Sequence, residues 1–296
     1  MTNKRLSLLT KALPIAASLV LLSGCIVHIS TSGSNVQQQQ QLSLSAAQLQ
    51  QLDIETEAGS LKVIGSTTAT DITVDATIFT AKTDDPYTLT LEQKGDKAVL
   101  VAKNDKASGM LVYQGSSPSI DLVVTVPSTF NLDIDDGSGD ININDVLGNM
   151  EIDDGSGSIN INQGNHVTID DGSGDIYLQN LTGNIEISDG SGSITAKSVA
   201  GLMNIEDGSG DLNLTDITGS VEIDDNSGSI NAERLGSYLT IEDGSGDIYV
   251  EHVNGLVTID DGSGSIRVNH AKGLTIIDDG SGDLSIDNIN GPVKLD

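Results

Sequence analysis

One short motif recurs through the second half of the chain at a nearly constant interval. Asp-Gly-Ser-Gly, with Asn once in place of the first Gly, appears nine times, and successive copies start 18 residues apart except for one interval of 17. A short repeat of fixed length is typical of proteins that stack identical supersecondary units, because one such unit cannot bury its apolar face alone. The repeat therefore predicts that the chain folds as an elongated repeat protein, not as a globular domain around one core. The copies begin at Asp136, Asp154, Asp171, Asp189, Asp207, Asp225, Asp243, Asp261 and Asp279.

Two alternating apolar stretches follow each motif. The first begins two residues after the second Gly, as in Ile141 and Ile143, and a second glycine such as Gly148 precedes the other stretch. Alternation with a period of two indicates a strand with one buried face. Two strands and two glycine corners per 18 residues predict one coil of a parallel β-solenoid. The second strands are expected to end at the core residues Ile152, Ile169, Ile187, Ile205, Ile223, Ile241, Ile259 and Ile277.

The predicted fold class is therefore all-β: a parallel β-solenoid, or β-helix, of about nine 18-residue coils over residues 131–296. Residues 51–130 are related but irregular, and Glu57–Val63 resembles a degenerate corner and first strand. We expect this segment to be a β cap that covers the first open edge of the solenoid.

The cap has strand signals of its own. Tyr87–Glu92 and Ala98–Ala102 alternate on either side of Gly95-Asp96, which predicts a β-hairpin. Ile120–Val126 predicts a further strand that ends at Pro127.

The residue after each second motif glycine alternates strictly between Asp and Ser. Equivalent residues of stacked strands lie about 4.8 Å apart, so Ser in every other coil doubles the separation of the Asp carboxylates to roughly 10 Å, near the Debye length. Relief of charge repulsion is one explanation of the pattern, and duplication of a 36-residue unit is the alternative; the two are compatible. The positions are Asp140, Ser158, Asp175, Ser193, Asp211, Ser229, Asp247, Ser265 and Asp283.

Residues 1–24 have the features of an export signal. Three cations precede the apolar stretch Ala12–Leu22, which is too short to span a bilayer. Leu22-Ser23-Gly24-Cys25 resembles the bacterial lipoprotein box, in which the cysteine is lipidated and becomes the new N-terminus. Cys25 is the only cysteine in the chain and has no disulfide partner within it. The alternative is an ordinary secretory signal with an incidental cysteine.

The expected location is the cell envelope, anchored by lipid on Cys25. In a Gram-negative organism, Ile26 after the cysteine resembles the signal for the outer membrane. Residues 25–50, with the run Gln37–Gln41, are low in complexity and predict a flexible tether between the lipid and the folded domain.

Charge and composition exclude some partners. A net charge of -29 argues against binding nucleic acid or anionic headgroups through charge. Aromatic residues make up only 2% of the chain and Trp is absent, so stacking platforms for sugars or bases are scarce. The same surface favours cations.

The nine corner Asp residues, from Asp136 to Asp279, are the candidate sites. One interpretation is an Asx turn, in which the carboxylate accepts a backbone N–H two residues on. The other is a row of Ca²⁺ sites between coils, because Ca²⁺ takes carboxylate and carbonyl oxygens. The two can coexist, although neither the calcium nonapeptide motif nor the EF-hand loop matches in spacing. No other cofactor is expected.

Catalysis is not expected. A carboxylate pair on a polysaccharide-active β-helix could serve as acid and base, but here the carboxylates are repeated from coil to coil. His166, His252 and His270 lie at variable positions without a recurring carboxylate or cysteine partner, which predicts surface residues.

Three features together resemble the bacterial domain family known as "putative adhesin". They are the repeated Gly-Ser-Gly-(Asp/Ser)-Ile, the stretch Ala58–Gly65 and the Val124–Pro127 step. The resemblance covers about residues 51–296, implies a β-solenoid domain of unknown function, and supplies no catalytic residue.

The expected function is a non-enzymatic, lipid-anchored, adhesin-like binding or structural module with an acidic repeated face. Its partner would be an envelope protein or a polysaccharide, with the membrane reached through Cys25. The alternative is a rod stiffened by Ca²⁺, and the third is a polysaccharide-active enzyme. The C-terminal edge, which has no obvious cap, is a candidate for end-to-end self-association.

Overall fold

The computed structural model describes residues 28–32, 35–82, 84–104 and 118–295, and these residues form strands and turns without a helix. No described segment is a helix long and apolar enough to cross a membrane. The predicted export signal, residues 1–24, and the predicted lipidation site, Cys25, lie outside the described residues.

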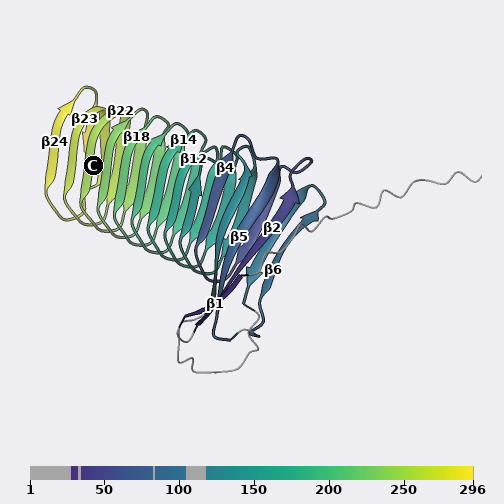
Figure 1. The fold of residues 1–296 in the computed structure, drawn as a ribbon. Helices are drawn as coiled ribbons and strands as arrows, with labels where there is room; N and C mark the ends of the chain where they lie inside the picture. Colours follow the sequence, from purple (N-terminus) through teal and green to yellow (C-terminus); the bar gives the residue numbers. More distant parts are fainter. Residues whose placement is uncertain (1–27, 33–34, 83, 105–117, 296) are drawn as a thin grey trace, which may run out of the picture.

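The repeats form a parallel β-solenoid, as predicted (Figure 1). Each coil has two strands, and each strand pairs in register with its equivalent in the next coil; Ile141 pairs with Ile159, for example. The first strands are β4 (Leu61–Ser66), β10 (Ile141–Asn144), β12 (Ile159–Gly164), β14 (Ile176–Leu181), β16 (Ile194–Val199), β18 (Leu212–Ile217), β20 (Ile230–Leu235), the first parts of β22 (Ile248–Asp261) and β23 (Ile266–Asp278), and β24 (Leu284–Ile289). The second strands are β3 (Gln51–Thr56), β9 (Asn131–Asp136), β11 (Met150–Asp154), β13 (Val167–Asp171), β15 (Ile185–Asp189), β17 (Met203–Asp207), β19 (Val221–Asp225), β21 (Leu239–Asp243), the second parts of β22 and β23, and β25 (Val293–Leu295).

The interior of the solenoid is apolar and continuous. One coil buries Ile141, Ile143, Val146, Met150 and Ile152, each at most 3% exposed. The neighbouring coils place side chains of the same kind above and below them, so the core extends without interruption from coil to coil. Because every coil depends on its neighbours for this burial, stability is shared along the stack.

The N-terminal cap continues both sheets. Strands β3 and β4 form a coil in register with β9 and β10, which confirms the degenerate copy predicted at Glu57–Val63. The predicted hairpin is present as β6 (Thr88–Lys94) and β7 (Lys97–Lys103), and β7 pairs parallel with β3.

On the other sheet, β8 (Ser119–Pro127) pairs parallel with β4, which confirms the strand predicted at Ile120–Val126. Antiparallel strands then follow: β5 (Asp71–Thr80) on β8, β2 (Asn35–Ser45) on β5, and β1 (His28–Ser32) on β2. Figure 1 shows these strands gathered at the N-terminal end of the solenoid.

The prediction that residues 25–50 form a tether is wrong for the part that the structure describes. Asn35–Ser45 is the strand β2, and it pairs with β5 from Val36 to Ser45. Val36, Gln38 and Leu42 face inward and are 7–8% exposed. Gln occupies both faces of this strand, so the alternation is hidden in the sequence, and the long aliphatic part of a Gln side chain can pack where an apolar residue would.

The two corners of each coil have different backbone requirements. The second glycine of each Gly-Ser-Gly, from Gly139 to Gly264, has φ between 137° and 159°. A Cβ added at Gly192 would lie 1.7 Å from the carbonyl oxygen of Gly174 in the preceding coil. Only glycine satisfies both conditions.

The other corner is formed by non-glycine residues in the left-handed conformation, with φ between 55° and 72°. We call these residues the left-handed column: Asp145, Gln163, Asn180, Ser198, Asp216, Arg234, His252, His270 and Asn288. The 17-residue interval is absorbed at this corner, because Asn144 pairs with Asn162 at a spacing of 18 and Met150 pairs with Val167 at a spacing of 17.

The C-terminal coil departs from the repeat. The pairing of β22 with β23 shifts by one residue between Ile259 and Asp260. Ile276 is therefore the core residue, 1% exposed, and the predicted core residue Ile277 is 47% exposed. The prediction for Ile277 was wrong because the repeat interval does not reveal where a bulge takes up an extra residue.

Candidate functional site

The corner Asp side chains point into the solenoid. Eight of the nine are buried, with exposed fractions of 0–6%: Asp136, Asp154, Asp171, Asp189, Asp207, Asp225, Asp243 and Asp261. In seven of them Oδ1 accepts the backbone N–H of the Ser two residues on, as from Ser191 to Asp189 at 3.0 Å. In Asp136, Oδ1 accepts the hydroxyl of Thr56 at 2.7 Å. The Asx turn is therefore what holds the Gly-Ser-Gly bend.

The second carboxyl oxygen of each of these eight residues is buried, and no described group forms a hydrogen bond with it. Burial, together with repulsion from the corner carboxyls of adjacent coils, raises the pKa of Asp154, Asp189 and Asp225 to about 7. Burial likewise raises the pKa of Asp243 to about 6. We call the eight carboxyls the inner Asp column. A proton on alternate members, or a cation between them, would satisfy these oxygens.

The ninth predicted corner residue, Asp279, is not part of the inner Asp column. The bulge in β23 leaves it exposed. Asp278, which is exposed and pairs with Asp260, forms the turn at this corner: its Oδ1 accepts the N–H of Gly280 at 2.9 Å.

The Asp and Ser that alternate after the motif are joined by hydrogen bonds across coils. The Oδ1 of Asp175 accepts the backbone N–H of Ser193 in the next coil at 3.0 Å. The same bond joins Asp140 to Ser158, Asp211 to Ser229, and Asp247 to Ser265 at 2.9–3.1 Å. The Asp thus has a direct role in stacking that the sequence pattern alone did not indicate.

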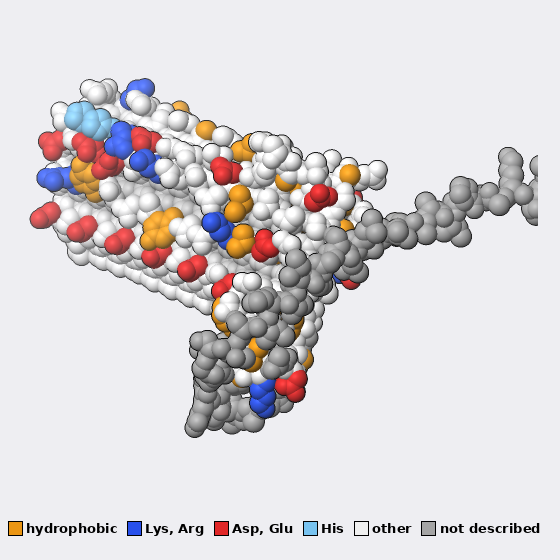
Figure 2. Space-filling view, in the orientation of Figure 1, with side chains coloured by type: hydrophobic (Ala, Val, Ile, Leu, Met, Phe, Trp, Pro, Cys, Tyr) orange, Lys and Arg blue, Asp and Glu red, His pale blue; other side chains and the backbone are white. Residues whose placement is uncertain are grey.

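The acids that precede the corner residues lie outside. They pair in register from coil to coil, interrupted only by Ser188, and most are exposed. We call these residues the outer acids: Asp135, Asp153, Asp170, Glu206, Asp224, Glu242 and Asp260. Acidic side chains recur at regular intervals along one edge of the face seen in Figure 2.

An open groove of about 530 Å³ crosses five coils on the outward face of β13, β15, β17, β19 and β21. Glu186 and Glu222 line it, together with Leu202, 55% exposed, and Tyr238, 61% exposed. The positions along its rim change from coil to coil: His166, Asn184, Leu202, Ser220 and Tyr238. Sequence reasoning missed this groove because these residues become neighbours only when the coils stack in register.

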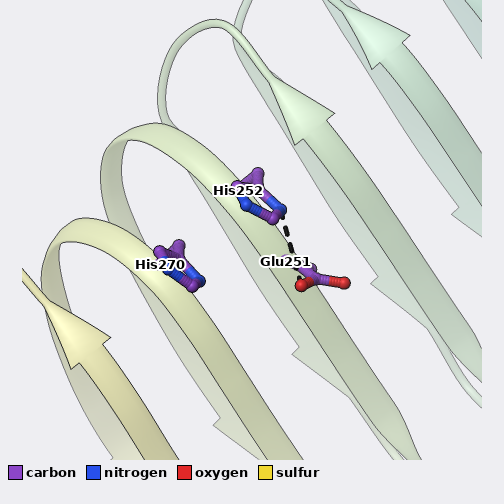
Figure 3. A group of neighbouring side chains, drawn as sticks. All are labelled: Glu251, His252 and His270. Carbon is purple, nitrogen blue, oxygen red and sulfur yellow. Dashed lines mark ion pairs between the residues drawn. The ribbon is translucent and has the colours of Figure 1, made fainter.

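A second group that the sequence did not predict lies near the C-terminal end (Figure 3). The rings of His252 and His270 stack with centroids 4.6 Å apart and planes at 9°. The Nδ1 of His252 lies 3.5 Å from Oε1 of Glu251. His252 is exposed, as expected, and Glu251 is a carboxylate neighbour particular to this coil, not a recurring partner of the histidines. By contrast, the Nδ1 of His166 accepts the backbone N–H of Asn184 at 3.0 Å.

Residues 49–242, from the degenerate first coil to β21, match the family Toastrack DUF4097. The chain belongs to this family. The match begins just before β3, so the Toastrack domain includes the irregular first coil as well as the regular repeats. The family has no established function, and no curated protein matches the sequence.

Solved structures similar to this Toastrack chain include a putative adhesin from Parabacteroides distasonis ATCC 8503, with 14% identity and a TM-score of 0.50. A putative adhesin from Bacteroides fragilis NCTC 9343 has 13% identity and a TM-score of 0.35. Each comparison covers 87% of this chain and 97% of the other. At such identity the first of these likenesses supports the β-solenoid fold alone.

Proposed function

We propose that this protein is a non-enzymatic module of the cell envelope, anchored by lipid on Cys25, that binds an extended envelope partner along its outer face. The observation that carries the proposal is the open groove over β13–β21. It runs along the stack, it combines the carboxylates of Glu186 and Glu222 with the exposed Leu202 and Tyr238, and its lining differs from coil to coil. If these surface residues served only folding, we would expect the same residue types in every coil, as at the Gly-Ser-Gly corners.

An envelope polysaccharide is the partner class that best fits the groove. A long groove of carboxylates, amides and hydroxyls offers many hydrogen bonds to a chain of hydroxyl groups, and Tyr238 offers one aromatic face. The adhesin names of the similar solved structures agree with a role at the cell surface. The repetition of the carboxylates, with no single distinctive acid–base pair among them, supports binding without catalysis.

The test compares groove variants with a matched control in cells that express the protein. The double variant Leu202→Ser, Tyr238→Ala should lower retention of envelope polysaccharide by the protein, while Tyr177→Ala should not. Tyr177 is also an exposed tyrosine, at 42%, but lies on the other sheet in β14. Equal retention of polysaccharide by the double variant and the unmodified protein would contradict the proposal. If instead a protein co-purifies with the unmodified chain and not with the double variant, the partner is that protein and not a polysaccharide.

A second candidate is a rod stiffened by Ca²⁺, favoured by the eight buried carboxyl oxygens that lack a hydrogen-bond partner among the described residues. A cation between adjacent coils would relieve the repulsion within the inner Asp column. Millimolar Ca²⁺ should then raise the melting temperature at pH 8, and Asp189→Asn should reduce that rise. An unchanged melting curve would leave protons as the species that these oxygens bind.

A further inference from the structure

The pair His252 and His270 occupies the left-handed column where β22 and β23 turn between their two parts. Both residues have φ of 59°, which projects their side chains outward on adjacent coils (Figure 3). Glu251 precedes His252 on the same strand. One ligand atom from each of the three residues lies within 4.8 Å of the other two. These three residues come from two coils and meet only because the strands pair in register.

Glu251 is held in place by hydrogen bonds from two neighbouring side chains. The hydroxyl of Tyr249 donates to its Oε2 at 2.6 Å, and Nδ2 of Asn269, the residue paired with it in the next coil, donates to its Oε1 at 3.2 Å. Such outer hydrogen bonds fix the orientation of carboxylates that bind metal ions. The carboxylate therefore has a defined direction before any ion arrives.

The Nδ1 of His270 supplies an independent observation. This atom is buried, and no described group forms a hydrogen bond with it. A buried polar atom without a partner is unfavourable by about 1–3 kcal/mol, so a ligand that pairs with this nitrogen is favoured. The other described histidines of known side-chain placement have a group near Nδ1: Asn184 for His166 and Glu251 for His252.

In the preceding coil a positively charged side chain occupies the position equivalent to His252. Arg234, the equivalent of His252, donates to Asp216 of the coil before it at 2.7 and 3.3 Å and to Glu233, the equivalent of Glu251, at 2.8 Å. There a guanidinium supplies the positive charge that joins two coils. In the next two coils imidazoles, which are common metal ligands, stand where the fixed cation stood, and the carboxylate remains as Glu251.

We propose that Glu251, His252 and His270 bind one divalent transition-metal ion of the Zn²⁺ class. Two imidazoles and a carboxylate are the donor set that Zn²⁺ takes in sites with an open fourth position, whereas Ca²⁺ and Mg²⁺ prefer oxygen ligands alone. Bonds of about 2.0–2.1 Å in tetrahedral geometry place two ligand atoms about 3.3 Å apart. From separations of up to 4.8 Å the ligand atoms would have to close by up to about 1.5 Å. The two imidazole rings, which stack at 9°, would also have to rotate until their nitrogen lone pairs converge on one ion, and His252 is exposed and has room to turn. The ion would join the coils of β22 and β23.

The test uses the full-length protein, purified in detergent without an affinity tag, and titrates it with Zn²⁺ in excess Mg²⁺ and Ca²⁺. The excess Mg²⁺ and Ca²⁺ are there to occupy the outer acids, so that Zn²⁺ does not bind to them. We expect one Zn²⁺ per chain, with affinity at least tenfold lower in His252→Ala, in His270→Ala and in Glu251→Gln. His166→Ala is the matched control, because His166 lies outside the group, and it should bind as the unmodified protein does.

A second measurement tests the site in the unmodified protein. Co²⁺ bound in place of Zn²⁺ should give the visible absorption of a low-coordinate site with nitrogen ligands, and this absorption should disappear when Zn²⁺ is added. Zn²⁺ binding of equal affinity in the double variant His252→Ala, His270→Ala would overturn the proposal. Loss of binding in His166→Ala alone, or a Co²⁺ spectrum of an octahedral ion with oxygen ligands only, would overturn it as well.

Discussion

The inner Asp column predicts that the solenoid becomes more stable as the solution becomes mildly acidic. Folding raises the pKa of Asp154, Asp189 and Asp225 from an ordinary value near 3.8 to about 7, and that of Asp243 to about 6. At a pH between about 4 and 6 to 7, these carboxyls are protonated in the folded chain and ionised in the unfolded chain. The stabilisation is therefore fully present below about pH 4 and is lost as the pH rises through 6 and 7.

The size of the effect follows from the number of protons. Each extra proton held by the folded state changes the free energy of unfolding by about 1.4 kcal/mol per pH unit. Four such carboxyls would give about 5 kcal/mol per pH unit near pH 5.5, and we halve this to roughly 3 kcal/mol for solvent screening at the corners. Hydrogen bonds from Arg234 and Tyr249 lower the pKa values of Asp216 and Glu251. These two carboxylates therefore make the folded state less stable as the pH falls, but only below about pH 4.

The assay is urea unfolding followed by far-ultraviolet circular dichroism at several pH values between 5 and 8. Asp189→Asn keeps the acceptor for the N–H of Ser191 but removes one titrating group. It should stabilise the protein at pH 8 and lower the pH slope by about one proton. Glu206→Gln, which removes an exposed acid on the neighbouring strand, should leave the slope unchanged. Stability that rises steadily from pH 5 to 8, or a loss of stability in Asp189→Asn at pH 8, would refute the reasoning.

Three further predictions concern the corners and the anchor. Gly192→Ala should destabilise the fold by about 3 kcal/mol or more, because φ of 145° and the carbonyl of Gly174 both oppose a Cβ. Gly208→Asn should cost less: the added Cβ would meet the carbonyl oxygen of Gly190 at 2.4 Å, but the backbone there is not left-handed and Asn226 already occupies the equivalent position; equal losses in urea unfolding would contradict this. Asp175→Ala should cost about 1 kcal/mol by removing the acceptor for Ser193 N–H, with Asp175→Asn retaining most of the stability in the same assay. Cys25→Ser should move the protein from the membrane fraction to the soluble fraction and abolish labelling by radioactive fatty acid; continued labelling would exclude Cys25 as the lipidation site.

The repeat predicted the solenoid and its core because two periods coincide in the sequence. Alternation sets which side chains face inward, as for Ile141 and Ile143, and the 18-residue interval sets which residues pair between coils. The corner Asp residues were identified correctly as special, but not their direction. A carboxylate beside Gly-Ser-Gly is compatible with facing either solvent or the core, and only the backbone fold places Asp189 inside.

What the sequence did not show depends on neighbours in space. Leu202 and Tyr238 become parts of one groove, and His270 comes to lie beside His252, through register at a corner where the residues vary. The strand β2 was missed for a different reason: Gln on both of its faces gives no alternation, and its partner β5 is an irregular strand of the cap.

The hydrogen bond from Asp175 to Ser193 has a consequence for how such a molecule can change in length over generations. Losing or gaining a single coil would either stack two Asp carboxylates in adjacent coils or bring two Ser together and leave one backbone N–H without its carboxylate. A change of two coils keeps the alternation. We therefore expect the length of the rod to vary between related proteins in steps of roughly 10 Å, the rise of two coils. Selection for a longer or shorter spacer would act through whole pairs of repeats, and the ends of the molecule would remain unchanged.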